Sequence, residues 1–205
     1  MLRKLQLLRL QSQLPKRLVL VGPPGAGKGT QAQFLASHFS IPHISTGDIF
    51  RANLKAGTEL GKQAQTFMDR GELVPDSVTN EMVKDRLTHG DVANGFILDG
   101  FPRNVAQAEV LRAILAEKKS PLQAVLEFSA PDAEIIARLL QRAEIEKRVD
   151  DKEDVIKRRL EVYAEQTAPI ISFYRNEGLL ISVSAVGNVE DITASAISAL
   201  SRVAQ

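Results

Sequence analysis

The chain has 205 residues, which fits one domain of ordinary size and is long enough to bury a sizeable core. Its 26 basic and 25 acidic residues nearly cancel, which argues against a general binder of nucleic acids or membrane surfaces. There is no cysteine, so disulfides and thiolate zinc sites are excluded. Any cationic site must therefore be local and built from particular lysines and arginines.

The first seventeen residues differ from the rest in composition. They contain many leucines, no acid and five basic residues, namely Arg3, Lys4, Arg9, Lys16 and Arg17. We expect an N-terminal extension over 1–17 and a single domain over 18–205. The extension is either an amphipathic targeting segment or a short disordered or surface-lying one. We expect a cytoplasmic protein, or an organellar one if the segment is a targeting signal; no stretch is long and apolar enough to cross a bilayer.

The first predicted elements are a strand, a glycine-rich loop and a helix. The apolar run at 18–21 indicates a buried strand, and the pattern over 28–38 indicates a helix. Residues 22–30 connect the strand to the helix and include the first residues of the helix. Their sequence, GPPGAGKGT, matches a phosphate-binding loop. Glycines let successive N–H groups converge, the helix start adds partial positive charge, and Lys28 adds a full charge. The segment therefore predicts a site for the phosphates of a nucleoside triphosphate.

One position departs from the general loop motif. The motif has Ser or Thr directly after the lysine, where the hydroxyl contacts magnesium. This chain has Gly29 there, and the hydroxyl comes one residue later at Thr30. We therefore expect magnesium to be held largely through waters and not by a direct hydroxyl ligand.

A weaker strand is predicted over 42–45, followed by a helical insert without a strand over 46–75. Ser45 and Asp48 form a capping pair that opens a helix at the start of this insert. Arg51, one turn further along, is placed to meet a second phosphate group. The insert is divided by four glycines: Gly47, Gly57, Gly61 and Gly71.

The next strand, predicted over 96–98, ends at an aspartate. In a chain with a phosphate loop, Asp99 either organises magnesium and its waters or caps the turn after the strand. Gly100 lets the chain turn sharply. Arg103 then projects from the same edge as Lys28, where a planar guanidinium can bind a phosphate with two hydrogen bonds.

The rest of the chain alternates strands and helices. Strands are predicted over 124–128 and 180–183, and helices over 104–117, 131–143, 153–176 and 190–202. This alternation predicts an α/β fold: a P-loop NTPase-like, parallel five-stranded sheet with helices on both faces. Ligands of such sheets lie beyond the carboxyl ends of the strands.

Four arginines in this part of the chain have a suggestive spacing. Arg138 and Arg142 share a helix face because they are four residues apart. Arg148 follows in a short charged segment over 144–151, and Arg159 lies on the next helix. Taken singly, each arginine is expected on a solvated face in an ion pair. Near a phosphate loop, such a cluster can stabilise the charge that spreads over a phosphoryl group during transfer.

Other kinds of active site are not indicated. No Ser-His-Asp or Cys-His set is evident, and no carboxylate pair suggests glycosidase chemistry. The histidines His38, His43 and His89 are widely spaced without a metal-ligand pattern, so we expect each to be an ordinary surface or packing residue.

Together these segments resemble the adenylate kinases, within the nucleoside monophosphate kinases. The resemblance extends from about Lys16 to Val203, and glycine at position 29 is part of it. Its ordered motifs are GPPGAGKGT at 22–30, STGD at 45–48, GELVPD at 71–76, LDGFPR at 98–103 with Gln107, RVDD at 148–151 and RLEVY at 159–163.

The resemblance implies phosphoryl transfer from ATP to AMP, giving two ADP, with magnesium and without zinc. It implies an AMP-binding insert over 46–75 and a short lid over 143–151, steadied by Asp150 and Asp151. Ala143 and Lys147 stand where short-lid relatives often have glycine. The substrates ATP, AMP and ADP are then the only expected partners; we expect a monomer that binds neither nucleic acid nor membrane.

The resemblance also implies roles for individual residues. The catalytic group comprises Lys28, Asp99, Arg103, Arg142, Arg148 and Arg159. The ATP-binding residues are Gly25, Ala26, Gly27, Lys28, Gly29 and Thr30, with Arg138 against the adenine and Arg142. The AMP-binding residues are Thr46, Arg51, Glu72, Leu73, Val74, Gly100, Arg103, Gln107, Arg148 and Arg159.

Two other readings remain open. A kinase for another nucleoside monophosphate, such as a UMP/CMP kinase, would use the same scaffold, although Thr46 and Gln107 favour AMP in this resemblance. A nucleotide-binding switch or inactive adaptor would bind ATP without a second substrate. The set of Arg51, Arg103 and Gln107 counts against such a protein.

Overall fold

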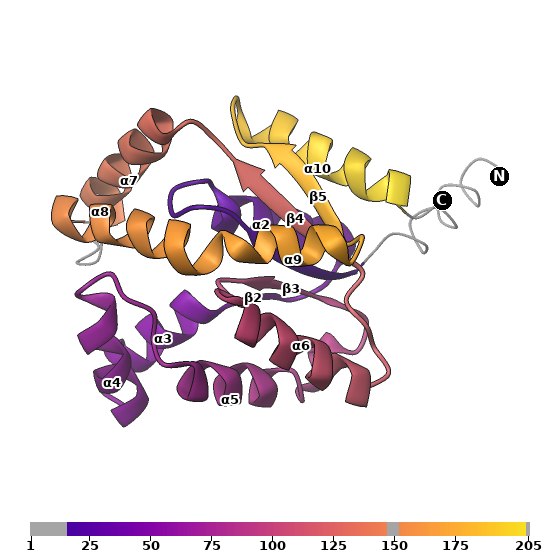
Figure 1. Ribbon diagram of the computed structural model, residues 1–205, viewed down its shortest axis with the longest axis horizontal. Helices are drawn as coiled ribbons and strands as arrows, with labels where there is room; N and C mark the ends of the chain where they lie inside the picture. The colour runs from indigo at the N-terminus through magenta and orange to yellow at the C-terminus, as the bar shows by residue number, and fades with distance from the viewer. Residues whose placement is uncertain (1–15, 147–151, 204–205) are drawn as a thin grey trace, which may run out of the picture.

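A five-stranded parallel sheet forms the centre of the computed structural model, which describes residues 16–146 and 152–203 (Figure 1). The strand order is β2-β3-β1-β4-β5, and every neighbouring pair is parallel. This confirms the predicted α/β fold with a five-stranded parallel sheet. The strands are β1 (Arg17–Val21), β2 (His43–Ser45), β3 (Phe96–Asp99), β4 (Ala124–Ser129) and β5 (Leu180–Ser184).

Helices cover both faces of the sheet. On one face, α2 (Lys28–Phe39) and α10 (Val189–Val203) share a hydrophobic cluster with β1, β4 and β5. On the other face, α5 (Asp76–Arg86), α6 (Val105–Glu117) and α9 (Pro169–Asn176) share a second cluster with β1, β3 and β4. Two smaller clusters lie outside these faces: α3 (Thr46–Lys55) packs with α4 (Glu59–Met68) and part of α5, and α7 (Asp132–Glu146) packs with α8 (Glu153–Val162).

Strand β1 shows why a continuous apolar run is needed. Successive side chains of a strand point to opposite faces of the sheet. Leu18 and Leu20 accordingly join the cluster under α2 and α10, while Val19 and Val21 join the cluster under α6 and α9. Because both faces are covered, all four side chains must be apolar.

The helix α5 was not predicted from the sequence. It begins directly after Pro75, and only Thr79 and Val83 are buried among its eleven residues. A pattern with so few apolar positions does not stand out as an amphipathic helix. A short 3-10 turn, η1 (Gly90–Val92), follows it before β3.

The segment 153–176, predicted as a single helix, is helical at every position except 168, but it divides into three elements. The helix α8 is followed by a π-helical turn, η3 (Tyr163–Thr167), and then by α9. In this turn the N–H of Ala168 donates to the carbonyl of Tyr163 at 2.8 Å, a five-residue spacing. Pro169, the first residue of α9, has no N–H to continue the normal pattern of the preceding helix.

The helix α7 extends three residues further than predicted, to Glu146. Residues 143–146 of the predicted lid are thus helical. Lys147, Arg148, Asp150 and Asp151 lie outside the described residues, as does the segment 1–15 of the predicted extension. The strand β1 begins at Arg17, one residue earlier than predicted.

The substitution Leu35→Ala tests the core under α2. Leu35 is fully buried in the cluster, so its truncation removes apolar contacts and leaves a cavity. We expect the free energy of unfolding, measured with urea, to fall by about 2–5 kcal/mol. The neighbouring Phe34 is 46% exposed on the same helix, and Phe34→Ala should change it by less than about 1 kcal/mol. Equal effects of the two changes would contradict this packing.

Candidate functional site

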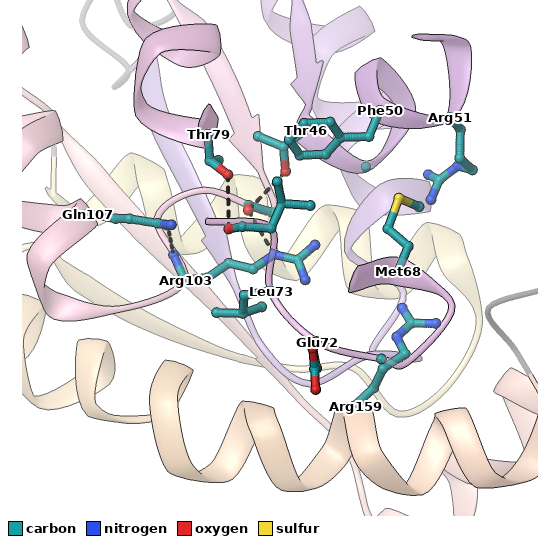
Figure 2. A pocket seen from close by; sticks show the side chains of 14 residues that line it. Thr46, Phe50, Arg51, Met68, Glu72, Leu73, Thr79, Arg103, Gln107 and Arg159 are labelled. Carbon is teal, nitrogen blue, oxygen red and sulfur yellow. Dashed lines mark hydrogen bonds between the residues drawn. The ribbon is translucent and has the colours of Figure 1, made fainter. Parts of the chain in front are cut away.

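Two neighbouring pockets open near the carboxyl ends of β1 and β3. The first, which we call the insert pocket, lies against α3 and α4 and is lined by Thr46, Gly47, Phe50, Arg51, Met68, Gly71, Glu72, Leu73, Val74, Thr79, Gly100, Arg103, Gln107 and Arg159 (Figure 2). The second, which we call the loop pocket, is lined by Leu20, Val21, Gly22, Pro24, Lys28, Gly71, Leu73, Asp99, Gly100, Pro102, Arg103, Arg159, Val162, Tyr163 and Thr167. Five residues line both pockets: Gly71, Leu73, Gly100, Arg103 and Arg159.

The glycine-rich loop leaves β1 and enters α2. Gly27 caps α2 in a left-handed conformation, with φ 80°. Gly25 has φ 84°, and a Cβ there would lie 2.8 Å from the carbonyl oxygen of Ile135, so a larger residue would collide with α7. Ala26 is buried behind the loop. The first N–H groups of α2, including those of Gly29 and Thr30, have no acceptor within the helix and can bind an anion.

Lys28 is folded back over this loop. Its Nζ donates to the carbonyl oxygens of Gly22 at 2.7 Å and Pro23 at 2.8 Å. An ammonium has three donors, so the loop fixes the position of the charge with two of them. Lys28 also lines the loop pocket.

The surroundings of Lys28 disfavour its charge. Burial lowers the pKa of Lys28 to about 8; Asp99 opposes this shift, and Arg103, Arg159 and Arg142 add to it. Three of the arginines singled out in the sequence therefore lie close enough to act on this lysine. Such a concentration of positive charge is suited to polyanionic ligands.

Asp99 is the last residue of β3, beside β1 and β2. The parallel register aligns it with Leu20 on one side and Ser45 on the other. Its Oδ2 lies 3.6 Å from Nε2 of His43. Burial by itself raises the pKa of Asp99, but His43, Lys28 and Arg103 together bring it below its usual value. The carboxylate is therefore charged.

His43 lies against Asp99, a contact that the sequence did not indicate. We expected a surface or packing histidine, but the structure places it against Asp99 with its Nε2 buried. The available signal was its position at the start of a strand next to β3. Phe50, Met68 and Thr79 of the insert pocket were also missed, because their apolar or polar character alone does not suggest a ligand site.

Gly29, which stands where the general phosphate-loop motif has Ser or Thr, lies next to Asp99. A Cβ built on Gly29 would lie 3.6 Å from Oδ2 of Asp99, so this position faces the carboxylate, whereas Thr30 is exposed. Within 16–146 and 152–203, no group of three His, Cys, Asp or Glu side chains could hold a metal ion. One half-buried carboxylate beside a phosphate loop fits a magnesium ion that keeps several waters and contacts substrate phosphates.

The carbonyl of Gly100 joins the insert to the turn after β3. It accepts from Oγ1 of Thr46 at 3.0 Å and from Nε of Arg103 at 2.9 Å (Figure 2). Gly100 has φ 82°, and a Cβ there would lie 2.6 Å from Oγ1 of Thr46. Only glycine allows this turn, which places Arg103 between the two pockets.

Three guanidinium groups point toward the same space in Figure 2: those of Arg51, Arg103 and Arg159. Arg51 pairs with Asp48 one turn earlier on α3. The backbone segment with Glu72, Leu73 and Val74 lines the same insert pocket. All the described residues that the resemblance implied for AMP therefore line one pocket, while Arg148 lies outside the described residues.

Arg138 and Arg142 lie on α7 and do not line either pocket. Arg138 donates to Glu134 on the same helix and, at 2.8 Å, to the carbonyl oxygen of Ala185 just after β5. It is thus fixed against the loop that follows β5.

Gln107 is buried at the start of α6. Its Oε1 accepts from the backbone N–H of Arg103 at 2.7 Å, and its Nε2 donates to Oδ1 of Asp76 at 2.7 Å. Asn104 caps α6 by accepting from the N–H of Gln107 at 2.8 Å. Sequence reasoning identified Gln107 but gave no role to Asp76 or Asn104, because only the tertiary structure brings α5 beside α6.

Comparisons with known proteins agree with this geometry. The family profile described as "Adenylate kinase" matches residues 20–179. The chain belongs to the adenylate kinase family. It is 60% identical over 184 residues to an "Adenylate kinase" of Thermobifida fusca (strain YX), covering 90% of this chain and 97% of that protein. It is 52% identical over 186 residues to one of Kocuria rhizophila, covering 91% of this chain and 99% of that protein.

Adenylate kinases are phosphotransferases, so the chain is an enzyme of this class. Family membership therefore argues against a nucleotide-binding switch or an inactive adaptor as the function of this chain. Across the described residues, no helix is both long and apolar enough to cross a membrane.

The low pKa of Lys28 predicts a pH-dependent affinity for ADP. Bound phosphates favour the charged amine and raise the pKa of Lys28 above about 8. Binding therefore takes up a proton, and affinity is greatest below this pKa and falls as pH rises through it. Calorimetric titration from about pH 7 to about pH 10 should show this fall.

The variant Lys28→Met should bind ADP more weakly and lose this fall in affinity. Lys62, an exposed lysine on α4, offers the control, and Lys62→Met should keep the wild-type profile. A profile that is the same in Lys28→Met and in the wild type would assign the titration to another group.

Proposed function

We propose that the loop pocket binds the phosphates of ATP and the insert pocket binds AMP, so that the two nucleotides meet tail to tail. The enzyme then transfers the terminal phosphoryl group of ATP to AMP and gives two ADP, the reaction from which the family takes its name. The observation that carries the proposal is that Arg103 and Arg159 line both pockets. Because these two arginines belong to both pockets, they lie where the phosphoryl group passes from one nucleotide to the other.

On the ATP side, the backbone over 25–30 and Lys28 hold the phosphates. The amides of the loop and the N-terminus of α2 converge there, and Lys28 lies over the loop on two carbonyls. Arg138 lies against the adenine of ATP, and Arg142 approaches the phosphates from α7. Both roles follow from the resemblance, supported for Arg142 by its electrostatic action on Lys28.

On the AMP side, Arg51 and Arg103 hold the phosphate. Thr46, Gly100 and Gln107 lie deeper in the insert pocket with the segment over 72–74, which contacts the ribose and base. The insert pocket has an apolar part from Phe50 and Met68, which suits a flat base.

Transfer is electrostatic in this proposal. Negative charge spreads over the oxygens of the phosphoryl group in flight, and fixed positive charges stabilise it. Lys28, Arg103, Arg142 and Arg159 supply these charges, and Arg148 joins them on the strength of the resemblance. No side chain forms a covalent bond to the phosphoryl group, because adenylate kinase chemistry needs only positioning and charge.

Asp99 would hold magnesium through its waters beside Gly29. A magnesium ion bound there would supply positive charge that neutralises part of the charge on the phosphate oxygens. The protein's part is a charged, half-buried carboxylate next to His43, whose charge is favoured by Lys28. No zinc is proposed for the lid.

The insert over 46–75 and the lid over 143–151 close over the substrates. ATP must react with AMP and not with water, so both nucleotides are enclosed before transfer. The monomeric state, the cytoplasmic location and the absence of nucleic-acid and membrane partners stay predictions from the sequence.

The substitution Arg103→Ala tests the AMP site. We expect kcat/KM for AMP to fall on the order of 10²–10³-fold, because the AMP phosphate and the transferred group both lose a charged contact. Affinity for ATP, measured by calorimetry, should change much less. The control Arg112→Ala removes an arginine that is 60% exposed and paired with Glu177, and it should leave both values unchanged. Undiminished ADP production by Arg103→Ala would overturn the assigned role.

Turnover with different monophosphates tests the choice of substrate. The purified enzyme with ATP and magnesium should use AMP in clear preference to CMP, UMP and GMP. Incubation with ADP and magnesium alone should yield ATP and AMP. A preference for CMP would instead support a UMP/CMP kinase.

A further inference from the structure

Asp76 lies beside the insert pocket and holds two polar side chains at the start of α6. It is the first residue of α5, and its carboxylate accepts three hydrogen bonds from the start of α6. Nδ2 of Asn104 donates to Oδ1 at 3.1 Å and to Oδ2 at 3.0 Å, and Nε2 of Gln107 donates to Oδ1 at 2.7 Å. The carboxylate itself does not line the pocket, whereas Gln107 does.

These contacts determine which way the Gln107 amide faces. A carboxylate can only accept, so the nitrogen of the amide must face Asp76. The backbone N–H of Arg103 can only donate, so the oxygen of the amide must face Arg103. Nε2 of Gln107 has two N–H groups and Oε1 has two lone pairs, and each atom uses one of its two in these bonds. One N–H and one oxygen lone pair are left for a ligand.

We propose that Asp76 is a positioning residue for base recognition: it holds the Gln107 amide in the orientation that accepts adenine and opposes a 6-oxopurine. This inference rests on the proposed function, in which Gln107 contacts the base of the nucleoside monophosphate. Adenine offers an amino donor next to a ring-nitrogen acceptor, which pairs with an amide's oxygen and N–H. A 6-oxopurine has an acceptor in place of the amino group, so it would set two oxygens against each other.

The alternative orientation of the amide is costly in this environment. Reversal would place Oε1 against the Asp76 carboxylate and Nε2 against the N–H of Arg103. Gln107 is 1% exposed, so water cannot relieve these two mismatches. The enzyme therefore cannot adapt to a 6-oxopurine by turning this side chain.

Asn104 is itself held in one orientation. Its Oδ1 accepts from the N–H of Gln107 as the cap of α6, so its Nδ2 must face Asp76. A variant with an amide at position 76 meets a conflict. With its oxygen in the place of Oδ1, the amide can accept from both neighbouring donors, but its nitrogen in the place of Oδ2 then meets the donor Nδ2 of Asn104. Turned the other way, the amide relieves this clash but sets its nitrogen against Nε2 of Gln107, which favours reversal of the Gln107 amide.

The experiment compares AMP with inosine monophosphate, which has a 6-oxo group in place of the amino group. The quantity measured is the ratio of kcat/KM for the two substrates, with saturating ATP and magnesium. This ratio does not depend on the fraction of each preparation that is folded. We expect Asp76→Asn to lower the preference for AMP about tenfold, which corresponds to one mismatched hydrogen bond.

The double variant Asp76→Asn with Asn104→Asp should restore the preference. The new amide at position 76 can donate to the new carboxylate at position 104 and still accept from Nε2 of Gln107. Aspartate also remains a good helix cap for α6. Rescue by this exchange is not expected if Asp76 serves only to stabilise the fold with its charge.

Two further variants separate the possible outcomes. Asn104→Ser keeps a capping side chain and the bond from Gln107 to Asp76 but loses the bond from Asn104 to Asp76. It should weaken thermal stability without changing the preference. Gln107→Ala should lower the preference at least as much as Asp76→Asn.

An unchanged preference in Gln107→Ala would show that Gln107 does not read the base, which contradicts the proposed function of this residue. A reduced preference in Gln107→Ala with an unchanged one in Asp76→Asn would overturn the inference about Asp76 alone. An equal loss in Asp76→Asn and Asn104→Ser would show that Asp76 acts by joining α5 to α6 and would also overturn it.

Discussion

The parallel pairing of β1 with β3 is the arrangement on which the rest of the site depends. It aligns Leu20 with Asp99, so the phosphate loop and the turn with Arg103 leave the sheet side by side. Strands buried on both faces have little freedom to slip, because a shift of one residue would move each apolar side chain to the wrong face. The rigid core thus fixes the distance between Lys28 and Asp99.

At this edge of the sheet, neighbouring charged groups determine whether Lys28 and Asp99 keep their charges. Lys28 is disfavoured as a cation by burial and by three arginines, and it is favoured by Asp99. Asp99 in turn keeps its charge because Lys28, His43 and Arg103 offset the effect of its burial. An excess of positive charge held in this way is relieved when phosphates bind, which favours polyanionic ligands at this edge of the sheet.

Two polar junctions join neighbouring elements around the insert pocket. The Gly100 carbonyl holds Thr46 of the insert and Arg103 at once. The Asp76 carboxylate holds Asn104 and Gln107 where the chain passes from the insert into α5. Both are buried or half-buried hydrogen-bond groups, for which a wrong partner costs more than a right one gains. They are suited to fixing orientation, with stability left mainly to the apolar clusters.

The sequence by itself determined the fold class, because the glycine-rich loop after an apolar strand and the alternation of strands with helices each have a local physical cause. It also indicated Lys28, Asp99 and Arg103 as site residues through local motifs, and it indicated Gln107 through the resemblance to the adenylate kinases. Only the tertiary structure decided which residues surround them. The contacts of His43 with Asp99 and of Asp76 with Asn104 and Gln107 have no local signal, since these partners lie 28 or more residues apart in the sequence. The polar helix α5 likewise depends on packing against its neighbours, which local apolar patterns describe poorly.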